Sequence, residues 1–421
     1  MSAIDSAPLP EIVSAWLDGR PEIIADPWPL YGRLRSEAPV MEQDNVVLVT
    51  RYADVLAMIQ DPRLSSRKRD NDQVEAQIAT LAPADAEIAR EWLGFQKTIL
   101  GNSDPPDHTR RRRLQIQGFM PRQLGAIEEY VRVTTDKILD EAEAGGEFDF
   151  VADLAYQLPM RVIAHMLGVP ESDMPLIMAW SQDVGYVSGR GFHHAPERAT
   201  GLRGFMDYVA RTIRDRRAGP RDDLLGALIA AEEEGDKLST KELNVTFFNL
   251  LFSGHETTTT LLAMGMLAFL EHPDQWQLVC AEPSLVEDAV EELLRFVTPV
   301  NWISRVATEP IELEGGVIRP GPSVKLVLAS ANHDPEAFAE PDRFDIKRQG
   351  DAHGLFFGKG IHYCIGNALA RLEAKIAFGA MARRFPGVRL AAGDLEWRPN
   401  PLMRRVVALP VSLGRTPVAA R

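Results

Sequence analysis

The chain has 421 residues, 45% hydrophobic and 25% charged, which is the ordinary composition of a globular protein with a large core. Its 60 acidic and 46 basic residues give a net charge of −14, which argues against a nucleic-acid partner. Residues 1–20 contain neither a long apolar run nor a basic segment before one. We therefore expect no signal peptide and no membrane anchor.

The number of cysteines and the absence of linker segments limit the class of protein and the number of domains further. The two cysteines, Cys280 and Cys364, are too few for a disulfide framework or a four-cysteine metal site, and we expect a cytoplasmic protein. Length alone would suggest roughly three domains. However, no linker, low-complexity segment or internal repeat divides the chain. We predict a single domain over residues 1–421.

Helical periodicity dominates the chain, because apolar residues recur at spacings of three and four in several segments. Strand-like segments are short and separated by proline and glycine. In chain order, we predict a strand at 46–50 and then helices at 127–139, 154–167, 224–232 and 286–296. Three further strands follow at 306–313, 324–328 and 406–413. The predicted fold class is mainly α with small β-sheets.

The longest predicted helix lies between Ser239 and Pro273. Ser239 and Glu242 match the Ser-x-x-Glu capping box, and Pro273 marks the far end. The roughly 33 residues between them would form a rod of about 50 Å, apolar on nearly every face and therefore central in the protein. A membrane span is the alternative, but the polar stretch 254–260 in the middle argues against it.

The middle of this helix is built from residues that helices and cores disfavour. Gly254 costs about 1 kcal/mol relative to alanine, and the threonines from Thr257 onward are weak helix formers. A buried Glu256 is costly as well. Such violations indicate a functional site, the alternative being a solvated polar stripe on a surface helix.

The strongest motif is the sequence FGKGIHYCIG at 357–366. A lone cysteine is more often a small buried hydrophobe, and we interpret Cys280 in that way. At Cys364, however, two glycines allow a tight turn and a helical pattern begins just after the sulfur. A helix N-terminus favours a thiolate over a thiol. A thiolate held in this way suits iron, on which it favours O–O cleavage.

This segment resembles the haem-ligand motif of the cytochrome P450 family, F-x-x-G-x-H-x-C-x-G. Four further segments extend the resemblance over almost the whole chain, in the order of the family. Residues 104–112 are similar to the bacterial segment that supplies His and Arg to a haem propionate, and 253–258 resemble the A-G-x-E-T-T oxygen-binding groove, with Ser253 at its first position. Residues 292–295 resemble the E-x-x-R helix, and 341–344 resemble the P-E-R-F element.

The resemblance implies a haem b cofactor with Cys364 as the axial ligand of the iron. It also implies three groups of residues around the haem. The first group is His108, Arg112, Arg305 and His362 at the propionates, with Phe357 and Gly358 in the ligand loop. The second is Glu292, Arg295 and Arg343, in a buried charge cluster that locks this loop. The third is Gly254, Glu256 and Thr257, which would admit oxygen and relay protons to it.

The implied reaction is the oxidation of a medium-sized, mainly apolar small molecule with O₂. The electrons would come from a separate ferredoxin or flavodoxin, since no flavin or iron–sulfur domain fits within this length. Basic residues at 110–113, Lys359 and Arg371 would dock an acidic ferredoxin, unless they are ordinary solvated charge. Two other functions stay open: a peroxide-driven or non-oxygenating haem-thiolate enzyme, and a non-catalytic haem sensor.

The substrate pocket is assigned by the same resemblance. The segments that line it in the family correspond here to Leu250, Val300, Asn301, Trp302, Ile303, Leu402 and Met403, with Trp92, Phe95 and Trp180 as further candidates. This set is mostly apolar, as ligand pockets usually are, and Asn301 would be an orienting polar group. The alternative is that several of these residues belong to the core.

Overall fold

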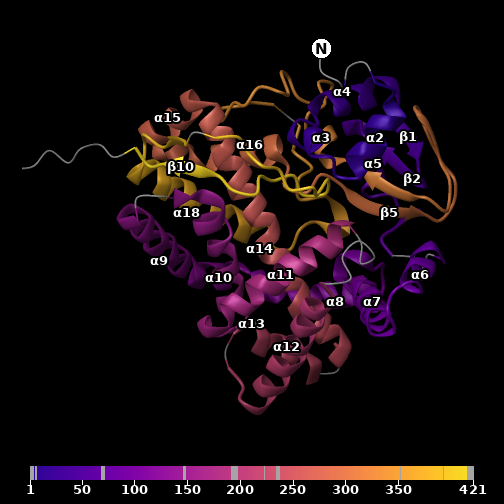
Figure 1. Cartoon of the computed structure of the whole chain (residues 1–421), viewed down its shortest axis with the longest axis horizontal. Coiled ribbons are helices and arrows are strands. Elements are labelled where there is room, and N and C mark those ends of the chain that lie inside the picture. Colours follow the sequence, from indigo (N-terminus) through magenta and orange to yellow (C-terminus); the bar gives the residue numbers. More distant parts are fainter. Residues whose placement is uncertain are drawn as a thin grey trace, which may run out of the picture. The chain divides into compact units, whose positions relative to one another are not determined.

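A computed structural model describes residues 4, 7–67, 72–145, 148–190, 198–221, 223–233, 238–350, 352–391 and 393–414. The chain is mainly α-helical with small sheets, which confirms the predicted fold class (Figure 1). Its contacts form two compact units. The first comprises Met1–Leu64, Glu128–Pro159 and Thr257–Arg421, and the second comprises Ser65–Ile127 and Met160–Glu256.

The first unit contains the main sheet. Strands β1 (Val40–Gln43), β2 (Val46–Val49), β8 (Ser323–Leu326) and β5 (Ile303–Ala307) lie in the order β1-β2-β8-β5, and β3 (Leu64–Ser65) follows at the edge where the chain leaves the unit. β2 runs parallel to β8, whereas β1 pairs with β2 and β5 pairs with β8 in the antiparallel sense. Asp44 and Asn45, with φ of 49° and 63°, supply the left-handed two-residue turn that joins β1 to β2.

Helices cover this sheet and complete the first unit. Four of them, α2 to α5, lie beside β1, β2 and β5 (Figure 1). The helices of the unit are α2 (Leu9–Leu17), α3 (Pro21–Ala25), α4 (Trp28–Glu37), α5 (Tyr52–Met58), α15 (Pro273–Ala281), α16 (Val286–Val297), α17 (Leu328–Ala331) and α18 (Asn367–Arg384), with most of α9 (Pro121–Gly145). Trp16 and Tyr31, both fully buried with ring centroids 5.6 Å apart, anchor one core cluster between α2 and α4.

The second unit is built from helices. They are α6 (Asp72–Ile78), α7 (Pro83–Gln96), α8 (Asp107–Gln115), α11 (Met174–Arg190), α12 (Ala199–Ala218) and α13 (Leu224–Glu233), with most of α10 (Gln157–Met166) and the first half of α14 (Thr240–Glu271). Its core contains an aromatic cluster in which Phe248 lies 4.5 Å from Phe205 and 4.9 Å from Phe95, between ring centroids.

Helix α14 matches the predicted long helix. It has 32 residues, and its N-terminus is closed by the predicted capping box, in which the Ser239 backbone N–H donates to Glu242 at 2.8 Å and the Glu242 N–H donates to the Ser239 hydroxyl at 3.2 Å. No helix in the part of the chain that the structure describes has the length and hydropathy to span a membrane.

Three of the predicted strands are wrong in extent. The segment 324–328 runs past the end of β8 at Leu326 and reaches Leu328, where α17 begins. The segment 306–313 is divided between β5 and β6 (Ile311–Leu313), because Pro310 has no N–H to continue a ladder. Strand β6 pairs instead with β7 (Gly316–Ile318). The segment 406–413 contains the short strand β10 (Pro410–Ser412), which lies between β4 (Phe148–Asp149) and β9 (Arg389–Leu390), and an isolated bridge from Val406 to Trp397.

Candidate haem site

The Cys364 loop is a tight turn held by backbone hydrogen bonds. Gly358 and Gly360 have φ of 71° and 70°, a conformation that glycine adopts without steric cost. The Cys364 N–H donates to the Phe357 carbonyl at 3.0 Å, and the Gly358 N–H donates to the Leu355 carbonyl at 2.8 Å. The loop therefore holds the cysteine in one place relative to the chain that precedes it.

The end of the loop joins directly to helix α18, which begins at Asn367. The Asn367 side-chain amide donates to the Cys364 carbonyl at 2.8 Å, so the cysteine is fixed just before the helix N-terminus. Free N–H groups at this end favour a thiolate. Cys280, within α15, differs, because burial raises the pKa of its thiol. Cys364 is only half-buried, and a thiolate at a helix N-terminus has the chemistry that suits a haem iron.

A buried ion cluster lies in the same unit. The Arg295 guanidinium donates to the two carboxylate oxygens of Glu292, at 2.8 Å each, and the Arg348 Nε donates to both of them at 3.1 Å. Glu292 and Arg295 are buried. The Asp345 N–H adds a third donor to Glu292 at 3.1 Å. Such complete pairing is what a buried carboxylate requires.

Arg343 was predicted to complete this cluster, and that prediction is wrong. The Arg343 side chain is 60% exposed and pairs with Glu340 at 3.2 Å. Only its backbone carbonyl reaches Arg295, at 3.5 Å. Arg348 takes the expected place because the chain turns after Phe344, which is buried, and returns Arg348 toward α16.

Asn332 connects the ion cluster to the cysteine loop. The Arg295 Nη1 donates to the Asn332 carbonyl at 2.8 Å, and the Asn332 side-chain oxygen accepts from the Leu355 N–H at 2.7 Å. Leu355 in turn holds Gly358 of the loop. Three steps of hydrogen bonding therefore lead from Arg295 to the turn that precedes Cys364.

The polar turn of α14 begins in the second unit. The Ser253 hydroxyl bonds the Asn249 carbonyl at 2.5 Å, which is the ordinary back-bond of a helical serine. A Cβ atom on Gly254 would come within 2.8 Å of the Ile163 side chain of α10. Gly254 therefore permits close helix packing, and its predicted role in admitting oxygen stays a prediction.

The four consecutive threonines of α14, Thr257 to Thr260, belong to the first unit and differ in exposure. Thr257 is half-buried, whereas Thr258, Thr259 and Thr260 are buried. Thr257 is therefore the most accessible of the four. This agrees with its expected role but does not test it.

The residues expected at the propionates come from both units. His108 and Arg112 lie on α8 of the second unit, and His108 is buried. Arg305 on β5 and His362 in the cysteine loop belong to the first unit, where the Arg305 Nη1 donates to the Ser304 carbonyl at 2.9 Å. Binding of the propionates by these residues stays a prediction.

Two members of the basic run at 110–113 have structural partners. Arg110 and Arg111 pair with Glu242 at the start of α14, at 2.5 Å and 2.9 Å. Burial alone would raise the pKa of Glu242, but Arg110 and Ser239 hold it below its usual range. Because Arg111 is also buried, it is unsuited to docking a partner protein.

Two of the predicted pocket residues have structural partners of their own. The Asn301 side-chain amide donates to the Pro401 carbonyl at 2.7 Å, so it joins two segments of the first unit. Trp302 packs edge-on against Trp16 at 5.1 Å and lies under the Lys325 ammonium at 4.4 Å. Trp302 is thus part of the core, which was the alternative interpretation.

The candidates from the second unit also lie in packed surroundings. Trp92 and Phe95 are buried and contact Phe248, with ring centroids at 5.4 Å and 4.9 Å. Trp180 stacks on Phe205 at 6.1 Å. The lining role of the other predicted residues stays a prediction: Leu250, Val300, Ile303, Leu402 and Met403.

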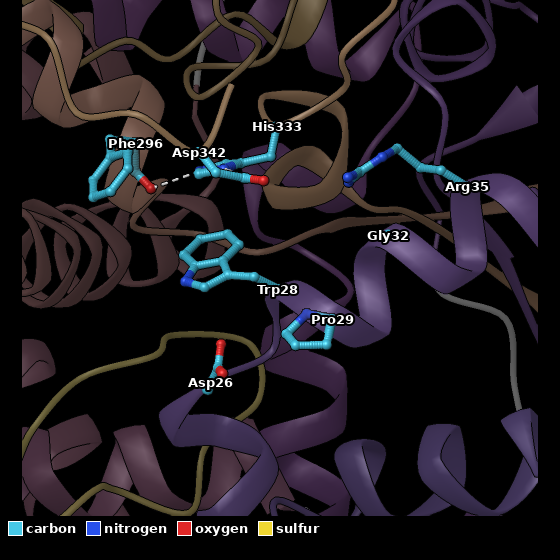
Figure 2. Close-up of a pocket in the computed structure, with 8 residues that line it drawn as sticks. All are labelled: Asp26, Trp28, Pro29, Gly32, Arg35, Phe296, His333 and Asp342. Carbon is cyan, nitrogen blue, oxygen red and sulfur yellow. Dashed lines mark hydrogen bonds and ion pairs between the residues drawn. The ribbon is translucent and has the colours of Figure 1, made fainter. Parts of the chain in front are cut away.

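A pocket of about 420 Å³ in the first unit is separate from all these residues (Figure 2). It is lined by Asp26, Trp28, Pro29, Gly32, Arg35, Phe296, His333 and Asp342. The His333 ring stacks on Trp28 at 4.1 Å, and its two nitrogens lie 2.9 Å from Asp342 Oδ1 and 2.9 Å from the Phe296 carbonyl. Since none of the predicted site residues lines this pocket, we assign it to the scaffold.

Sequence reasoning did not identify Glu373 of α18. Its side chain is fully buried, and burial raises the pKa of its carboxyl well above the usual range, although the Thr258 hydroxyl acts in the opposite direction. A signal was available, because Leu369 and Ala377, four residues before and after Glu373, are apolar and buried. A glutamate within an apolar helical stripe indicates a buried carboxyl.

Comparisons with known proteins show which family the chain resembles along its length. A family model for cytochrome P450 matches residues 156–404. The chain is 39% identical to cytochrome P450 monooxygenase PikC from Streptomyces venezuelae over 95% of this chain and 94% of that protein. It is 37% identical to vitamin D(3) 25-hydroxylase from Pseudonocardia autotrophica over 92% of this chain and 94% of that protein.

A solved structure extends the agreement to three dimensions. PksS, a cytochrome P450 of the bacillaene polyketide synthase from Bacillus subtilis, matches with a TM-score of 0.82 at 34% identity, covering 94% of this chain and 99% of that chain. The chain therefore belongs to the cytochrome P450 family. It is a cytochrome P450 monooxygenase, and membership of this family implies a haem cofactor.

Proposed function

We propose that this monooxygenase hydroxylates a medium-sized, mainly apolar natural product of the polyketide or steroid type. The observation that carries the reaction class is Cys364, held half-buried before the N-terminus of α18 by its own loop. The substrate type is supported by the relatives, of which PksS is named for a polyketide synthase and another for vitamin D(3).

The haem would supply the oxidising chemistry once it is bound to the chain. The Cys364 thiolate would bind the iron, and cationic or hydrogen-bonding side chains would neutralise the propionates. For this second role we propose His108, Arg112, Arg305 and His362. Arg305 suits the binding of a propionate, because it is buried in β5 and a buried guanidinium is stabilised by an anionic partner.

Residues of α14 would deliver the two protons that oxygen reduction consumes. The Thr257 hydroxyl is both donor and acceptor, so it can pass a proton on. Glu256 is the adjacent acid and is buried, which keeps it from exchanging freely with solvent. We assign the relay to these two side chains.

The electrons would come from a separate ferredoxin or flavodoxin. Lys359 in the cysteine loop and Arg113 of α8 are exposed basic residues that an acidic partner could contact. Arg371 is less suitable, because it pairs with Glu291 and lies over the Phe357 ring at 4.6 Å. A cytoplasmic location, with neither Cys280 nor Cys364 in a disulfide, is consistent with this proposal.

One experiment tests the reaction and its alternatives together. The haem-loaded protein is titrated with polyketide macrolactones and steroids, and compounds that change the iron spin state are incubated either with NADPH, ferredoxin and ferredoxin reductase or with hydrogen peroxide alone. We expect a hydroxylated product only with the reductase system. Product from peroxide alone indicates a peroxide-driven enzyme, and haem binding without any product indicates a sensor.

A further inference from the structure

The buried His255 of α14 has a defined tautomer. Its Nδ1 lies 2.8 Å from the Leu251 carbonyl, one turn earlier in the same helix. A carbonyl oxygen only accepts hydrogen bonds, so Nδ1 carries a hydrogen and donates it. In the neutral ring, the lone pair is therefore on Nε2.

This Nε2 atom faces the acid of the predicted relay. It lies 3.7 Å from Glu256 Oε2, and the two side chains are 0% and 5% exposed. The edge of the Phe252 ring packs against the imidazole, with centroids 5.8 Å apart. A carboxylate and a lone pair at this separation repel each other where water is excluded, and one proton on either group turns the repulsion into attraction.

We propose that His255 is a positioning residue for proton delivery and holds, together with Glu256, one transferable proton. The pair exists either as imidazolium and carboxylate or as imidazole and carboxylic acid. This inference rests on the proposed relay role of Glu256. It adds a reason why that residue is ready to donate at neutral pH, where an isolated glutamate is ionised and an isolated histidine is mostly neutral.

The step is balanced and moves no electrons. When the proton leaves toward Thr257, Glu256 becomes a carboxylate and His255 a neutral imidazole whose Nδ1–H still bonds Leu251. The next proton from solvent restores the pair. An isolated glutamate in the same buried place would have to recover its proton without a neighbouring base to receive it first.

Spectroscopy of the haem-loaded protein tests the proposal. The reduced, CO-bound form is diamagnetic, so ¹⁵N-histidine NMR resolves the ring nitrogens at pH 7.5, and infrared difference spectra against Glu256→Gln detect the acid C=O band. We expect either a doubly protonated His255 or a protonated Glu256. A singly protonated His255 beside an ionised Glu256 would overturn the proposal.

The chain offers an internal control in His272. Its Nδ1 makes the same bond to a carbonyl one turn earlier, Ala268 at 2.8 Å, but the His272 side chain is only half-buried, whereas His255 is fully buried. The His272 ring is therefore the reference for an imidazole whose Nδ1–H is donated to a helix carbonyl. Identical Nε2 signals for the two histidines, with no acid band, count against the proposal.

The variant His255→Asn distinguishes the loss of the shared proton from a loss of folding. The asparagine amide can still donate to Leu251 but has no atom at the Nε2 position. We expect a normal CO-bound spectrum, loss of the shared proton, and product formation slowed about tenfold, less than the at least about 100-fold expected when a proton donor itself is lost. An acid band that persists in His255→Asn shows that Glu256 keeps its proton unaided, which refutes the role of His255.

Three further outcomes keep this test separate from the test of the proposed function. If His255→Asn does not bind haem, the wild-type spectra with the His272 control still decide the proposal. If the wild-type enzyme forms no product at all, the proposed function fails whatever the state of the pair. A coupled wild-type enzyme with no shared proton removes the His255 proposal alone.

Discussion

The Arg348 Nε lies 3.1 Å from both carboxylate oxygens of Glu292, whereas the Arg343 side chain, five residues earlier, is 60% exposed and pairs with Glu340. Glu292 is therefore shared by two guanidinium groups, those of Arg295 and Arg348. Because this cluster reaches the cysteine loop through Asn332, its integrity should govern haem retention as well as folding.

Arg348→Ala is the first test of this arrangement. Removing one partner from a buried ion cluster leaves charge uncompensated and costs about 3–5 kcal/mol. We expect Arg348→Ala and Glu292→Ala to give protein that is largely haem-free or insoluble, as measured by the haem-to-protein ratio and by urea unfolding. Arg343→Ala is the matched control and should resemble the wild type, and the reverse order of the two arginine variants would contradict the structure.

The second prediction concerns the axial ligand. We expect the reduced, CO-bound protein to show the red-shifted Soret band of thiolate ligation. Cys364→His should retain haem and lose this band, because imidazole replaces the thiolate. Cys280→Ser is the control and should keep the band, since Cys280 lies in α15 and favours the thiol. A band that survives Cys364→Ser but is lost in Cys280→Ser would show that the assignment of Cys364 as the ligand is wrong.

The third prediction concerns Thr257. Thr257→Val is nearly isosteric but removes the hydroxyl that would pass on a proton. We expect this variant to fold, bind haem and consume NADPH while releasing hydrogen peroxide in place of product. Thr259→Val is the control, because Thr259 is fully buried and should only pack. The product formed per NADPH is the quantity to measure, and full coupling in Thr257→Val would eliminate the relay.

The fourth prediction concerns Glu373 and the pH dependence of stability. Its raised pKa means that the folded protein keeps this proton over a range in which the unfolded chain, with a glutamate pKa near about 4.3, has lost it. In that range the folded state binds more protons, so the free energy of unfolding falls as pH rises, by up to about 1.4 kcal/mol per pH unit.

Glu373→Gln should remove this slope. We expect the variant to unfold at about the same urea concentration as the wild type near pH 4.5 and to be the more stable of the two at pH 8. Glu287→Gln is the control, because Glu287 is exposed and its hydrogen bond with Lys375 lowers its pKa, which gives the opposite sign. Parallel pH profiles for wild type and Glu373→Gln would show that Glu373 is ionised in the folded protein.

The fifth prediction concerns the electron donor. Lys359 is exposed in the cysteine loop, so Lys359→Glu should slow reduction by an acidic ferredoxin, and the wild-type rate should fall as salt rises. Lys137→Glu in α9 changes the net charge equally and should have little effect. Arg111→Glu is not an informative variant, since Arg111 holds Glu242. Stopped-flow reduction rates that change neither with salt nor in Lys359→Glu would exclude this docking surface.

Local patterns determined much of this protein. The capping box at Ser239, the continuous apolar faces of α14 and the glycines of the cysteine loop each act within a few residues, so their consequences can be read from neighbouring letters. The same holds for the pairing of Glu292 with Arg295, which are three residues apart on one helix. These patterns were also sufficient to indicate the family, and they predict Cys364 as the axial ligand.

Only the tertiary structure decided which distant groups meet. Arg348 rather than Arg343 reaches Glu292 because of the path of a loop more than 50 positions away, and no local preference specifies that path. The burial of Arg111 against Glu242, the bond of the Asn301 amide to Pro401 and the raised pKa of Glu373 in the core have the same origin. Desolvation and pairing depend on what packs nearby, and packing is a property of the whole fold.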